Sequence, residues 1–473
     1  MLFFRNMYYN MKYLILLFTG IIFVACATKS QNKEESKKQE SFVELQNPVI
    51  PGYFADPSIV QHEGKFYMYV TADPWGTEFL SCWESEDFQN WTFHKLNWPT
   101  KEACTSLLSN TNNVWAPSVI KKEDTFYMYI SVGSEIWCGK ADHPLGPWRN
   151  MHVDQPMIPY DTTRYYHVID AEAFIDDDGR AYLYWGSGWE WINGRCFAAE
   201  LNEDMKSFKT EPVEVTPTNY FEGPLMLKHN GKYYLTYSEG KTIDETYEVR
   251  YAIGDSPLGP FIEATNGPIL KTDESLNVYG PGHHTIFTYG EKKYILYHRH
   301  SLPFVTGTAM RQTCIAVLEF DDITSKIRNL TPYHTQLFPN LAKKEIKYII
   351  PENIIASSEQ SFTKAKNVLD KNYATRWEAA SGDERSFLMV SFKNEVSVDT
   401  MEIRFEYPWK TYFFKLEVSS DEDKWVTAAD YAETGVSGSP VIITINNKCK
   451  QLRISFDDRN DGNIPSIWEL SFY

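Results

Sequence analysis

The sequence has little of three features that would otherwise narrow its class. Only seven of the 473 residues are cysteine, and the six after Cys26 are scattered without a Cys-x-x-Cys spacing, so a structural zinc site is not expected. Basic residues are outnumbered, 46 Lys and Arg against 63 Asp and Glu, and the net charge of −17 disfavours nucleic acid and anionic membrane surfaces as partners. The apolar run at residues 13–24 is too short to predict a membrane span.

Residues 1–26 have the features of a lipoprotein-type signal peptide. Basic residues lead into the apolar run, and the small Ala25 precedes Cys26. This resembles a bacterial lipobox, with Phe23 where Leu is usual. The resemblance implies lipidation of Cys26 and anchoring at the bacterial cell envelope, in the periplasm or at the outer-membrane surface. The alternatives are a plain secretory signal, with disulfides whose pairing the sequence does not give, or an uncleaved anchor.

The rest of the chain divides into a tether and two domains. Residues 27–46 are rich in Lys, Glu, Ser and Gln and are expected to form a disordered tether. The remaining residues are too many for one ordinary core, and their pattern changes near residue 348. We therefore expect one domain over residues 47–345 and a second over residues 346–473.

A strand–turn–strand pattern recurs five times between residues 56 and 297. Each copy has a polar residue, an apolar strand, a polar turn and a strand rich in aromatic residues. The equivalent tyrosines, spaced by 60, 55, 52 and 60 residues, are Tyr67, Tyr127, Tyr182, Tyr234 and Tyr294. A period of roughly 50 residues with several short strands is typical of a β-propeller, and five copies predict five blades.

The repeat stops at about residue 348, and shorter segments of alternating polarity follow. Examples are residues 387–392, 401–405 and 441–445. Alternating strands over the last part of the chain predict a β-sandwich. The expected fold class is therefore all-β, a five-bladed β-propeller followed by a β-sandwich.

Carboxylic acids occupy three of the five positions at which the innermost strands are expected to begin. Allowing one residue of slip, these axial positions are Asp56, Ala116, Asp170, Glu222 and His283. The innermost strands of a propeller start at one end of its axis, so the side chains should meet in one pocket. Hydrolysis of a glycosidic bond needs a proton donor and an ionised carboxylate, and a third acid can raise the pKa of the donor. The pattern indicates a glycosidase.

The motifs around these positions resemble glycoside hydrolase family 43 over residues 47–335. In order they are Asp56-Pro-Ser, Trp115-Ala-Pro, Asp170-Ala-Glu, Glu222-Gly-Pro and Gly280-Pro-Gly-His-His. The resemblance implies a five-bladed propeller that inverts the anomeric centre. It implies that Asp56 is the general base, Glu222 the general acid and Asp170 the modulator of the acid's pKa. Asp170 is followed by Ala where many members have Pro.

The same resemblance implies further roles near the pocket. Sugar contacts are expected from Trp115, His283, Arg299 and Arg311. A histidine of this motif often helps to hold calcium through waters, so His283 is also the candidate ligand of a structural calcium; no other cofactor is required. The alternatives are a core role for Trp115, a hydrogen bond to the neighbouring blade for His283 with His284 as the competing histidine, and blade-closing ion pairs for both arginines.

A second resemblance covers roughly residues 350–473. Residues 355–359, 365–377 and 414–425 resemble a discoidin (F5/8 type C) domain, the jelly-roll fold of family 32 carbohydrate-binding modules. Such domains often bind galactose-type sugars through loops, and the aromatic residues between 407 and 412 lie in a candidate loop. The alternative is a domain that only supports the propeller.

Together these features predict an exo-acting glycoside hydrolase. The leading candidate removes terminal α-L-arabinofuranose from plant cell-wall or arabinogalactan-type saccharides, with membrane contact through the lipid anchor only and no nucleic acid. A β-xylosidase or a galactan-cleaving enzyme of the same fold is the alternative. A different class, a non-catalytic glycan-binding surface lipoprotein, is disfavoured because all three acids are present. The sequence leaves the sugar and its linkage open.

Overall fold

The computed structural model describes residues 41–473, except 106–112, 344–345, 382–384, 422–423 and 458–463. The described residues, from 41 to the C-terminus, belong to one compact unit. The expected signal peptide, Cys26 and most of the expected tether lie outside the described residues. Among the described segments, no helix has the length and apolar character needed to cross a membrane.

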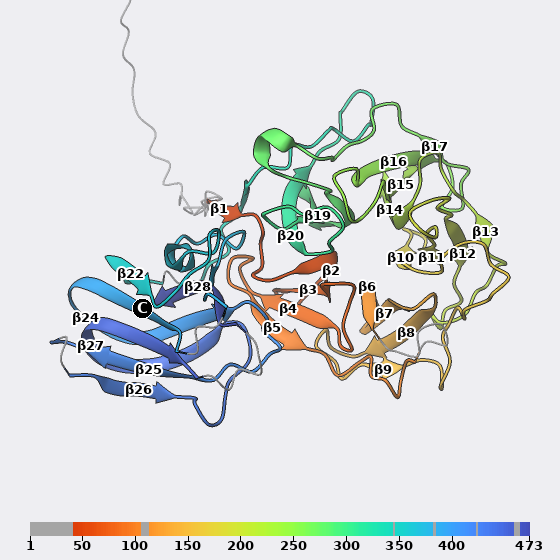
Figure 1. Cartoon of the computed structure of the whole chain (residues 1–473). Coiled ribbons are helices and arrows are strands. Elements are labelled where there is room, and N and C mark those ends of the chain that lie inside the picture. Colours follow the sequence, from red (N-terminus) through yellow and green to blue (C-terminus); the bar gives the residue numbers. More distant parts are fainter. Residues whose placement is uncertain (1–40, 106–112, 344–345, 382–384, 422–423, 458–463) are drawn as a thin grey trace, which may run out of the picture. The chain divides into compact units, whose positions relative to one another are not determined.

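Five antiparallel sheets form the blades of a propeller, as predicted (Figure 1). Blade 1 contains β2 (Phe54–His62), β3 (Lys65–Ala72), β4 (Ser81–Ser85) and β5 (Thr92–Lys95). Blade 2 contains β6 (Val114–Lys122), β7 (Thr125–Val132), β8 (Ile136–Ala141) and β9 (Arg149–Asn150). Blade 3 contains β10 (Glu172–Ile175), β11 (Ala181–Trp185), β12 (Phe197–Glu200) and β13 (Val213–Glu214). In each blade the strands are paired in sequence order.

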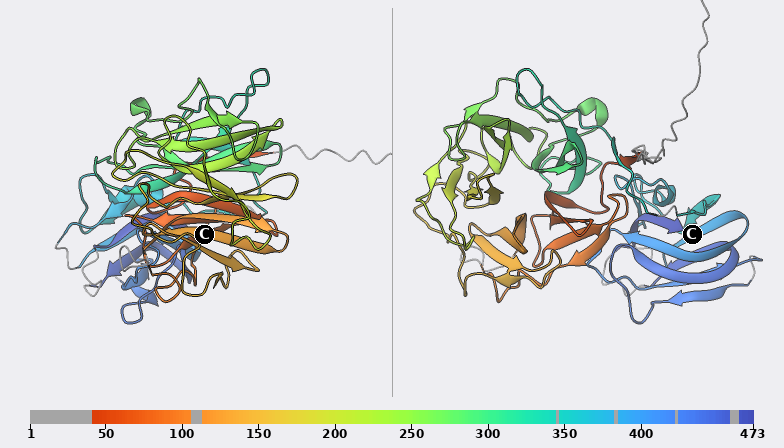
Figure 2. Two further views of the ribbon diagram at one scale, coloured as in Figure 1. Left: turned by 90° about the vertical axis from the view of Figure 1, so that its right-hand side faces the viewer. Right: turned by 180° about the vertical axis from the view of Figure 1, so that it is seen from behind.

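The last two blades complete the ring of sheets, which Figure 2 shows from behind. Blade 4 contains β14 (Glu222–His229), β15 (Lys232–Glu239), β16 (Glu248–Gly254) and β17 (Ile262–Glu263). Blade 5 contains β18 (Gly282–Tyr289), β19 (Lys292–His300) and β20 (Arg311–Leu318), and a short 3₁₀ helix, η1 (Glu274–Leu276), precedes it. The five repeating tyrosines all lie on the second strand of their blade, which confirms the repeat predicted from the sequence.

Local chemistry explains the hairpins that build each blade. The turn between β14 and β15 is Asn230-Gly231, and both residues have positive φ, 49° and 74°, as a two-residue type I′ turn requires. The second strands are buried on both faces; in β3, for example, every residue from Phe66 to Ala72 is buried. Hydrophobic packing between neighbouring sheets therefore fixes the blades around one axis.

The N-terminal segment closes the ring. β1 (Phe42–Gln46) pairs with β21 (Thr335–Pro339), and the N–H of Val49 donates to the carbonyl of Thr313 in β20. The side chain of Asn47 accepts from Ile315 N–H at 2.8 Å and donates to Ile315 O at 2.9 Å. The prediction that residues 27–46 are entirely a disordered tether is therefore wrong for residues 42–46, where alternation of burial marks an edge strand.

A seven-stranded antiparallel sheet folds into the C-terminal β-sandwich, as predicted. Its strands are β22 (Asn353–Ala356), β23 (Trp377–Glu378), β24 (Phe387–Phe405), β25 (Phe414–Ser419), β26 (Val426–Asp430), β27 (Val441–Phe456) and β28 (Ser466–Phe472). The 3₁₀ helix η2 (Ala365–Leu369) precedes β23. The long strands β24 and β27 shift register where they bend, and the buried core includes Phe405, Phe414 and Phe456.

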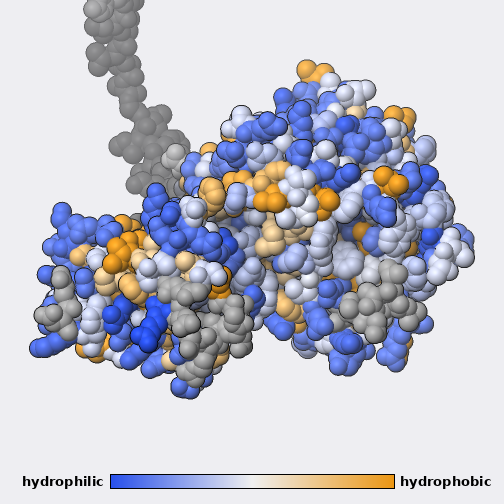
Figure 3. Space-filling model, in the orientation of Figure 1, coloured by the Kyte–Doolittle hydropathy of each residue, from blue (hydrophilic) through white to orange (hydrophobic). Residues whose placement is uncertain are grey.

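The face of the molecule in Figure 3 is largely hydrophilic with scattered apolar groups.

The sandwich packs against blade 1 through its aromatic loop. Trp409 lies 5.9 Å from Phe54 and 5.5 Å from Phe79, measured between ring centroids. The hydroxyl of Tyr53 donates to Glu406 at 3.1 Å. Tyr412 is buried in the sandwich itself, stacked on Phe405. Trp409 and Tyr412, two of the aromatic residues between 407 and 412, therefore have packing roles in this structure.

Candidate active site

Each blade presents its axial position through the same backbone distortion. The residue with left-handed φ is the axial residue itself in four blades, Asp56 (50°), Ala116 (49°), Asp170 (58°) and His283 (31°), and in blade 4 it is Gly223 (60°), the residue after Glu222. In four innermost strands the hairpin register also shifts here, which marks a β-bulge. A left-handed residue with a side chain costs about 1–2 kcal/mol, so the surrounding structure must hold it in place.

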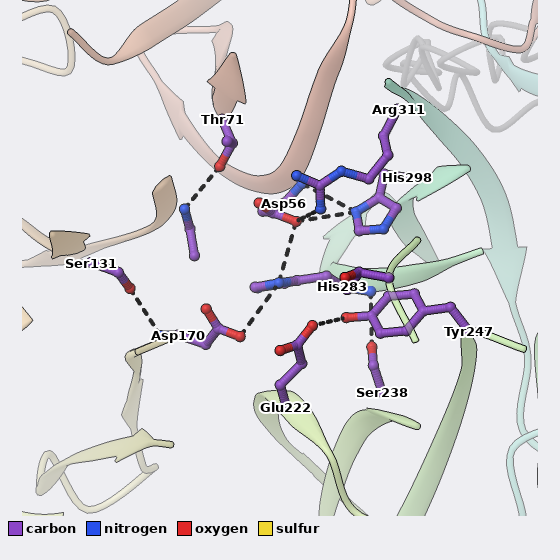
Figure 4. Close-up of polar contacts among 12 residues, drawn as sticks. Asp56, Thr71, Ser131, Asp170, Glu222, Ser238, Tyr247, His283, His298 and Arg311 are labelled. Carbon is purple, nitrogen blue, oxygen red and sulfur yellow. Dashed lines mark hydrogen bonds and ion pairs between the residues drawn. The ribbon is translucent and has the colours of Figure 1, made fainter. Parts of the chain in front are cut away.

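A side chain from the preceding blade supplies that support. Thr71 Oγ1 accepts from Ala116 N–H at 2.8 Å, Ser131 Oγ from Asp170 N–H at 2.9 Å, and Ser238 Oγ from His283 N–H at 2.9 Å (Figure 4). In blade 1 this place is taken by His298 of blade 5, whose Nδ1 lies 3.4 Å from Asp56 N. Neighbouring blades therefore fix one another's axial residues.

Asp56 is buried among nitrogen-bearing side chains. Its Oδ1 lies 3.0 Å from Arg311 Nη1, 3.1 Å from His298 Nδ1 and 3.3 Å from His283 Nδ1. Burial alone would raise the pKa of Asp56, but Arg311 and the two histidines hold it well below its usual range. These three contacts all involve Oδ1. They leave Oδ2 as the oxygen of Asp56 that can accept a proton.

Arg311 is itself held by a second buried carboxylate, Asp73. Arg311 donates from Nη2 to Asp73 Oδ1 at 2.7 Å and from Nε to Oδ2 at 2.9 Å, and its backbone N–H also donates to Oδ2. Paired hydrogen bonds of this kind fix a guanidinium in both position and orientation. One arginine therefore lies between two acids that reach it from different segments of blade 1.

Glu222 begins β14 and is buried in a neutral hydrogen-bonding environment. Its Oε1 accepts from the Tyr247 hydroxyl at 2.8 Å, and its Oε2 lies 3.0 Å from Ser187 Oγ. Burial raises the pKa of Glu222 to about 7, although the hydrogen bonds from Tyr247 and Ser187 oppose the rise. Glu222 can therefore carry a proton at mildly acidic pH, where Asp56 is ionised.

Asp170 lies just before β10 and next to both of these acids. Its pKa is raised well above the usual range, first by burial and then by the negative charges of Glu222 and Asp56. His283 Nδ1 lies 3.7 Å from Asp170 Oδ2, so this ring sits between Asp56 and Asp170 (Figure 4). The three carboxyl groups thus differ in their affinity for protons because their surroundings differ.

All three acids line one cavity of about 250 Å³. Six of the residues predicted for the site contribute to its wall: Asp56, Trp115, Asp170, Glu222, His283 and Arg311. Its remaining wall includes residues that sequence reasoning did not propose: Trp75, His167, Ser187, Trp189, Trp191 and Thr242. A cavity of this size suits a single sugar ring, and its aromatic walls with a few convergent polar groups are typical of a small-ligand site.

Arg299 does not belong to this wall. It is 1% exposed, and its guanidinium donates to the carbonyl of Asn47 at 3.0 Å and meets His334 Nδ1 at 3.2 Å. Both partners lie in the segments that close the ring of blades. Arg299 therefore helps to close the ring of blades, which was the alternative, and does not make the predicted sugar contact.

The calcium that the family resemblance implied at His283, held through waters, stays a prediction. Nδ1 of His283 is directed at two carboxylates, and calcium prefers a shell of oxygen ligands. Across the described residues, no group of three or more His, Cys, Asp or Glu side chains is arranged to hold a metal ion. The six described cysteines are buried and free.

Several residues that support the site were not predicted, although a repeating pattern in the sequence marks their positions. The side chains that support the axial positions stand four or five residues after the repeating tyrosines: Thr71, Ser131, Ser187, Ser238 and His298. This is a second polar repeat within the aromatic strands. Asp73 and Tyr247 carry no comparable signal, because their roles depend on loops that only the folded ring brings to the axis.

Comparison with known proteins identifies the class. The model of glycosyl hydrolases family 43 matches residues 45–324, and the F5/8 type C domain model matches residues 353–470. The chain belongs to glycosyl hydrolase family 43 and carries a C-terminal F5/8 type C domain. It is therefore a glycoside hydrolase.

Individual relatives match large parts of this chain. The chain is 37% identical over 295 residues to the beta-D-galactofuranosidase xynD of Aspergillus niger, covering 58% of this chain and 82% of the relative. It is 26% identical to a xylosidase/arabinosidase of Bacteroides ovatus, covering 58% of this chain and 94% of the relative. A solved glycoside hydrolase matches 90% of this chain and 99% of its own, with a TM-score of 0.76 and 26% identity.

Proposed function

We propose that the protein is an inverting exo-glycoside hydrolase that removes terminal α-L-arabinofuranose from plant polysaccharides. The observation that supports this most is the opposite tuning of two carboxyl groups in one cavity. Asp56 is held ionised by Arg311, whereas burial raises the pKa of Glu222 to about 7. Inverting hydrolysis needs one acid in each of these states.

In the proposed reaction Glu222 gives its proton to the glycosidic oxygen while the bond from that oxygen to the anomeric carbon breaks. A water molecule attacks the anomeric carbon from the opposite face. Asp56 takes a proton from this water through Oδ2, so one water is consumed and the released sugar has the inverted configuration. Arg311 and the histidines around Oδ1 keep Asp56 in place throughout.

Asp170 acts on the donor rather than on the substrate. Its carboxyl group lies beside Glu222, and each negative charge that forms there makes ionisation of the other group harder. The N–H of Gly223, the residue after Glu222, also binds the Asp170 carboxyl group. Asp170 therefore holds the strand start that carries the acid and supports its protonated state.

A second candidate substrate is a terminal β-D-galactofuranose. The relative from Aspergillus niger, 37% identical over 295 residues, is a beta-D-galactofuranosidase. The two furanoses have the same ring configuration and differ by one additional hydroxymethyl group outside the ring. A β-xyloside is a third candidate, supported by the xylosidase/arabinosidase relative.

A substrate panel tests the proposal. Purified protein is assayed with nitrophenyl α-L-arabinofuranoside, β-D-galactofuranoside and β-D-xyloside, and NMR follows the anomer first released. We expect fastest turnover of the arabinofuranoside with inversion. On an arabinofuranosyl oligosaccharide, whose leaving group needs a proton, Glu222→Gln should be impaired, and the exposed Glu274→Gln on η1 is the matched control. Retention of configuration, or release of arabinose from that oligosaccharide unaffected by Glu222→Gln, would refute the mechanism, and glycan binding without turnover would indicate the non-catalytic class.

The lipid anchor remains a proposal from the sequence. If Cys26 is lipidated, the enzyme acts at the bacterial envelope on polysaccharide outside the cytoplasm, with the F5/8 type C domain next to the catalytic domain. Fractionation of cells that express the full chain tests this directly. Cys26→Ser should move the protein from the membrane pellet to the soluble fraction, whereas Cys449→Ser, which changes a buried cysteine, should not.

A further inference from the structure

The mouth of the cavity is lined by tryptophans that are unusually accessible. Trp75 comes from the loop between β3 and β4, while Trp189 and Trp191 come from the loop between β11 and β12. Trp75 is 46% exposed and Trp189 is 37% exposed. The rings of Trp75 and Trp191 lie 6.5 Å apart and are tilted by 48°. Contiguous exposed aromatic surface of this kind usually marks a binding site.

These rings are held in place despite their exposure. Trp191 donates from Nε1 to Thr242 Oγ1 at 2.8 Å, Trp189 stacks on His167 at 4.1 Å, and the Arg311 guanidinium lies 5.7 Å from the Trp75 ring centroid. Trp75 and Trp191 also have left-handed backbone conformations, with φ of 58° and 59°. Strained residues in fixed positions are characteristic of functional sites.

Two glycines allow the second loop to fold this tightly. A Cβ on Gly188 would lie 1.8 Å from the carbonyl oxygen of Ile192, and a Cβ on Gly194 would lie 2.3 Å from that of Phe221. Neither position can accept a side chain without moving the backbone. The loop therefore presents Trp189 and Trp191 as a preformed surface, which lowers the entropic cost of binding.

We propose that Trp75, Trp189 and Trp191 form a platform for the first sugar of the leaving group, and that this sugar is a neutral pyranose. The inference rests on the proposed function. With the terminal sugar at Asp56 and Glu222 inside the cavity, the leaving group must extend through the mouth. The first sugar after the scissile bond therefore meets these three rings.

The chemistry of the platform selects the kind of sugar. A pyranose chair with equatorial hydroxyls exposes flat faces of C–H groups that pack on indole rings, whereas a puckered furanose offers less flat area. The exposed Glu190 lies at the same mouth, and its carboxylate disfavours a uronic acid there. The structure thus favours furanose branches on a neutral pyranose chain over a chain made of arabinofuranose alone.

Matched substrates test the platform. Wild type, Trp75→Ala and Trp189→Ala are compared on three compounds with the same terminal arabinofuranose: one linked to a xylo- or galacto-oligosaccharide, one in a 1,5-linked arabino-oligosaccharide, and the methyl glycoside. We expect kcat/KM to fall about tenfold further on the pyranose-linked compound than on the methyl glycoside. Phe362→Ala, an exposed aromatic residue of the sandwich, is the control.

Two results would overturn the platform. Equal losses on all three compounds would place the tryptophans at the terminal sugar, and equal losses on both oligosaccharides would remove the preference for a pyranose. A binding experiment separates failure of the platform from failure of the proposed function. Glu222→Gln, with and without Trp189→Ala, is titrated with xylotetraose and β-linked galactobiose, and binding is followed by tryptophan fluorescence. If no arabinofuranoside is turned over but Trp189→Ala still weakens pyranose binding, the proposed function fails and the platform stands; if Trp189→Ala leaves that binding unchanged, the platform fails.

Discussion

Asp73 holds Arg311 through both of its carboxylate oxygens, at 2.7 Å to Nη2 and 2.9 Å to Nε. Both side chains are almost completely buried, with exposed fractions of 1% and 3%. Arg311 also donates a hydrogen bond to Asp56 at 3.0 Å. The charge that keeps Asp56, the proposed base, ionised is thus shared with a carboxylate that lines no part of the cavity wall.

Asp73→Asn should therefore impair catalysis through Arg311. With one carboxylate lost, the cation acts on Asp56 alone and loses its fixed orientation, so we expect kcat to fall on the order of tenfold to a hundredfold. The added net positive charge should also move the alkaline limb of the pH–rate profile to lower pH. Steady-state kinetics across pH measure both effects. Asp142→Asn, at an exposed ion pair with Arg149, is the control, and a folded Asp73→Asn enzyme with normal kcat and pH profile would contradict this role.

The alkaline limb of activity should report the ionisation of Glu222. Because burial raises the pKa of this acid to about 7, the rate should fall as pH rises through neutrality and the proton is lost. Tyr247 stabilises the ionised form with a hydrogen bond that lowers the pKa. Tyr247→Phe should therefore move the alkaline limb to higher pH. A shift to lower pH, or no shift, would show that another group controls this limb.

The acid and the base should respond differently to the leaving group. Loss of the donor in Glu222→Gln should reduce kcat by roughly 10²–10⁴ on oligosaccharides but much less on a dinitrophenyl glycoside, whose leaving group needs no proton. Asp56→Asn should be similarly slow on both, since water must still be activated. Comparison of kcat for the two variants on the two substrates checks the assignment. Reversal of the pattern would exchange the two roles.

The contact between the sandwich and blade 1 should influence both stability and catalysis. Trp409 packs on Phe54, which stands two residues before Asp56, so Trp409→Ala should lower the melting temperature and reduce kcat. Truncation of a packed tryptophan costs about 3–5 kcal/mol, and less where the ring is partly exposed. Trp425→Ala is the matched control, because Trp425 packs under Arg453 within the sandwich. Equal effects of the two substitutions on kcat would argue against the coupling.

Much of the fold and the acidic centre could be predicted from sequence because both follow from a repeat. The tyrosine period locates the second strands, and those strands fix the starts of their neighbours, including Asp56 and Glu222. Residues in the loops were missed, because no periodic signal marks Asp73 or Trp191. Arg299 was misplaced for a related reason: β19 contributes to the axis at His298, and the next residue in a strand faces the other way.

Ala116 shows what the repeated backbone distortion makes available. It has the same left-handed φ as Asp56 and Asp170, and its N–H is bound by Thr71 in the same way, yet its methyl group brings no reactive chemistry. The ring therefore separates where a group is placed from what that group does. One backbone conformation therefore carries reactive side chains in some blades and an inert methyl group in another, so divergence can change the chemistry of the axis while the ring itself stays the same.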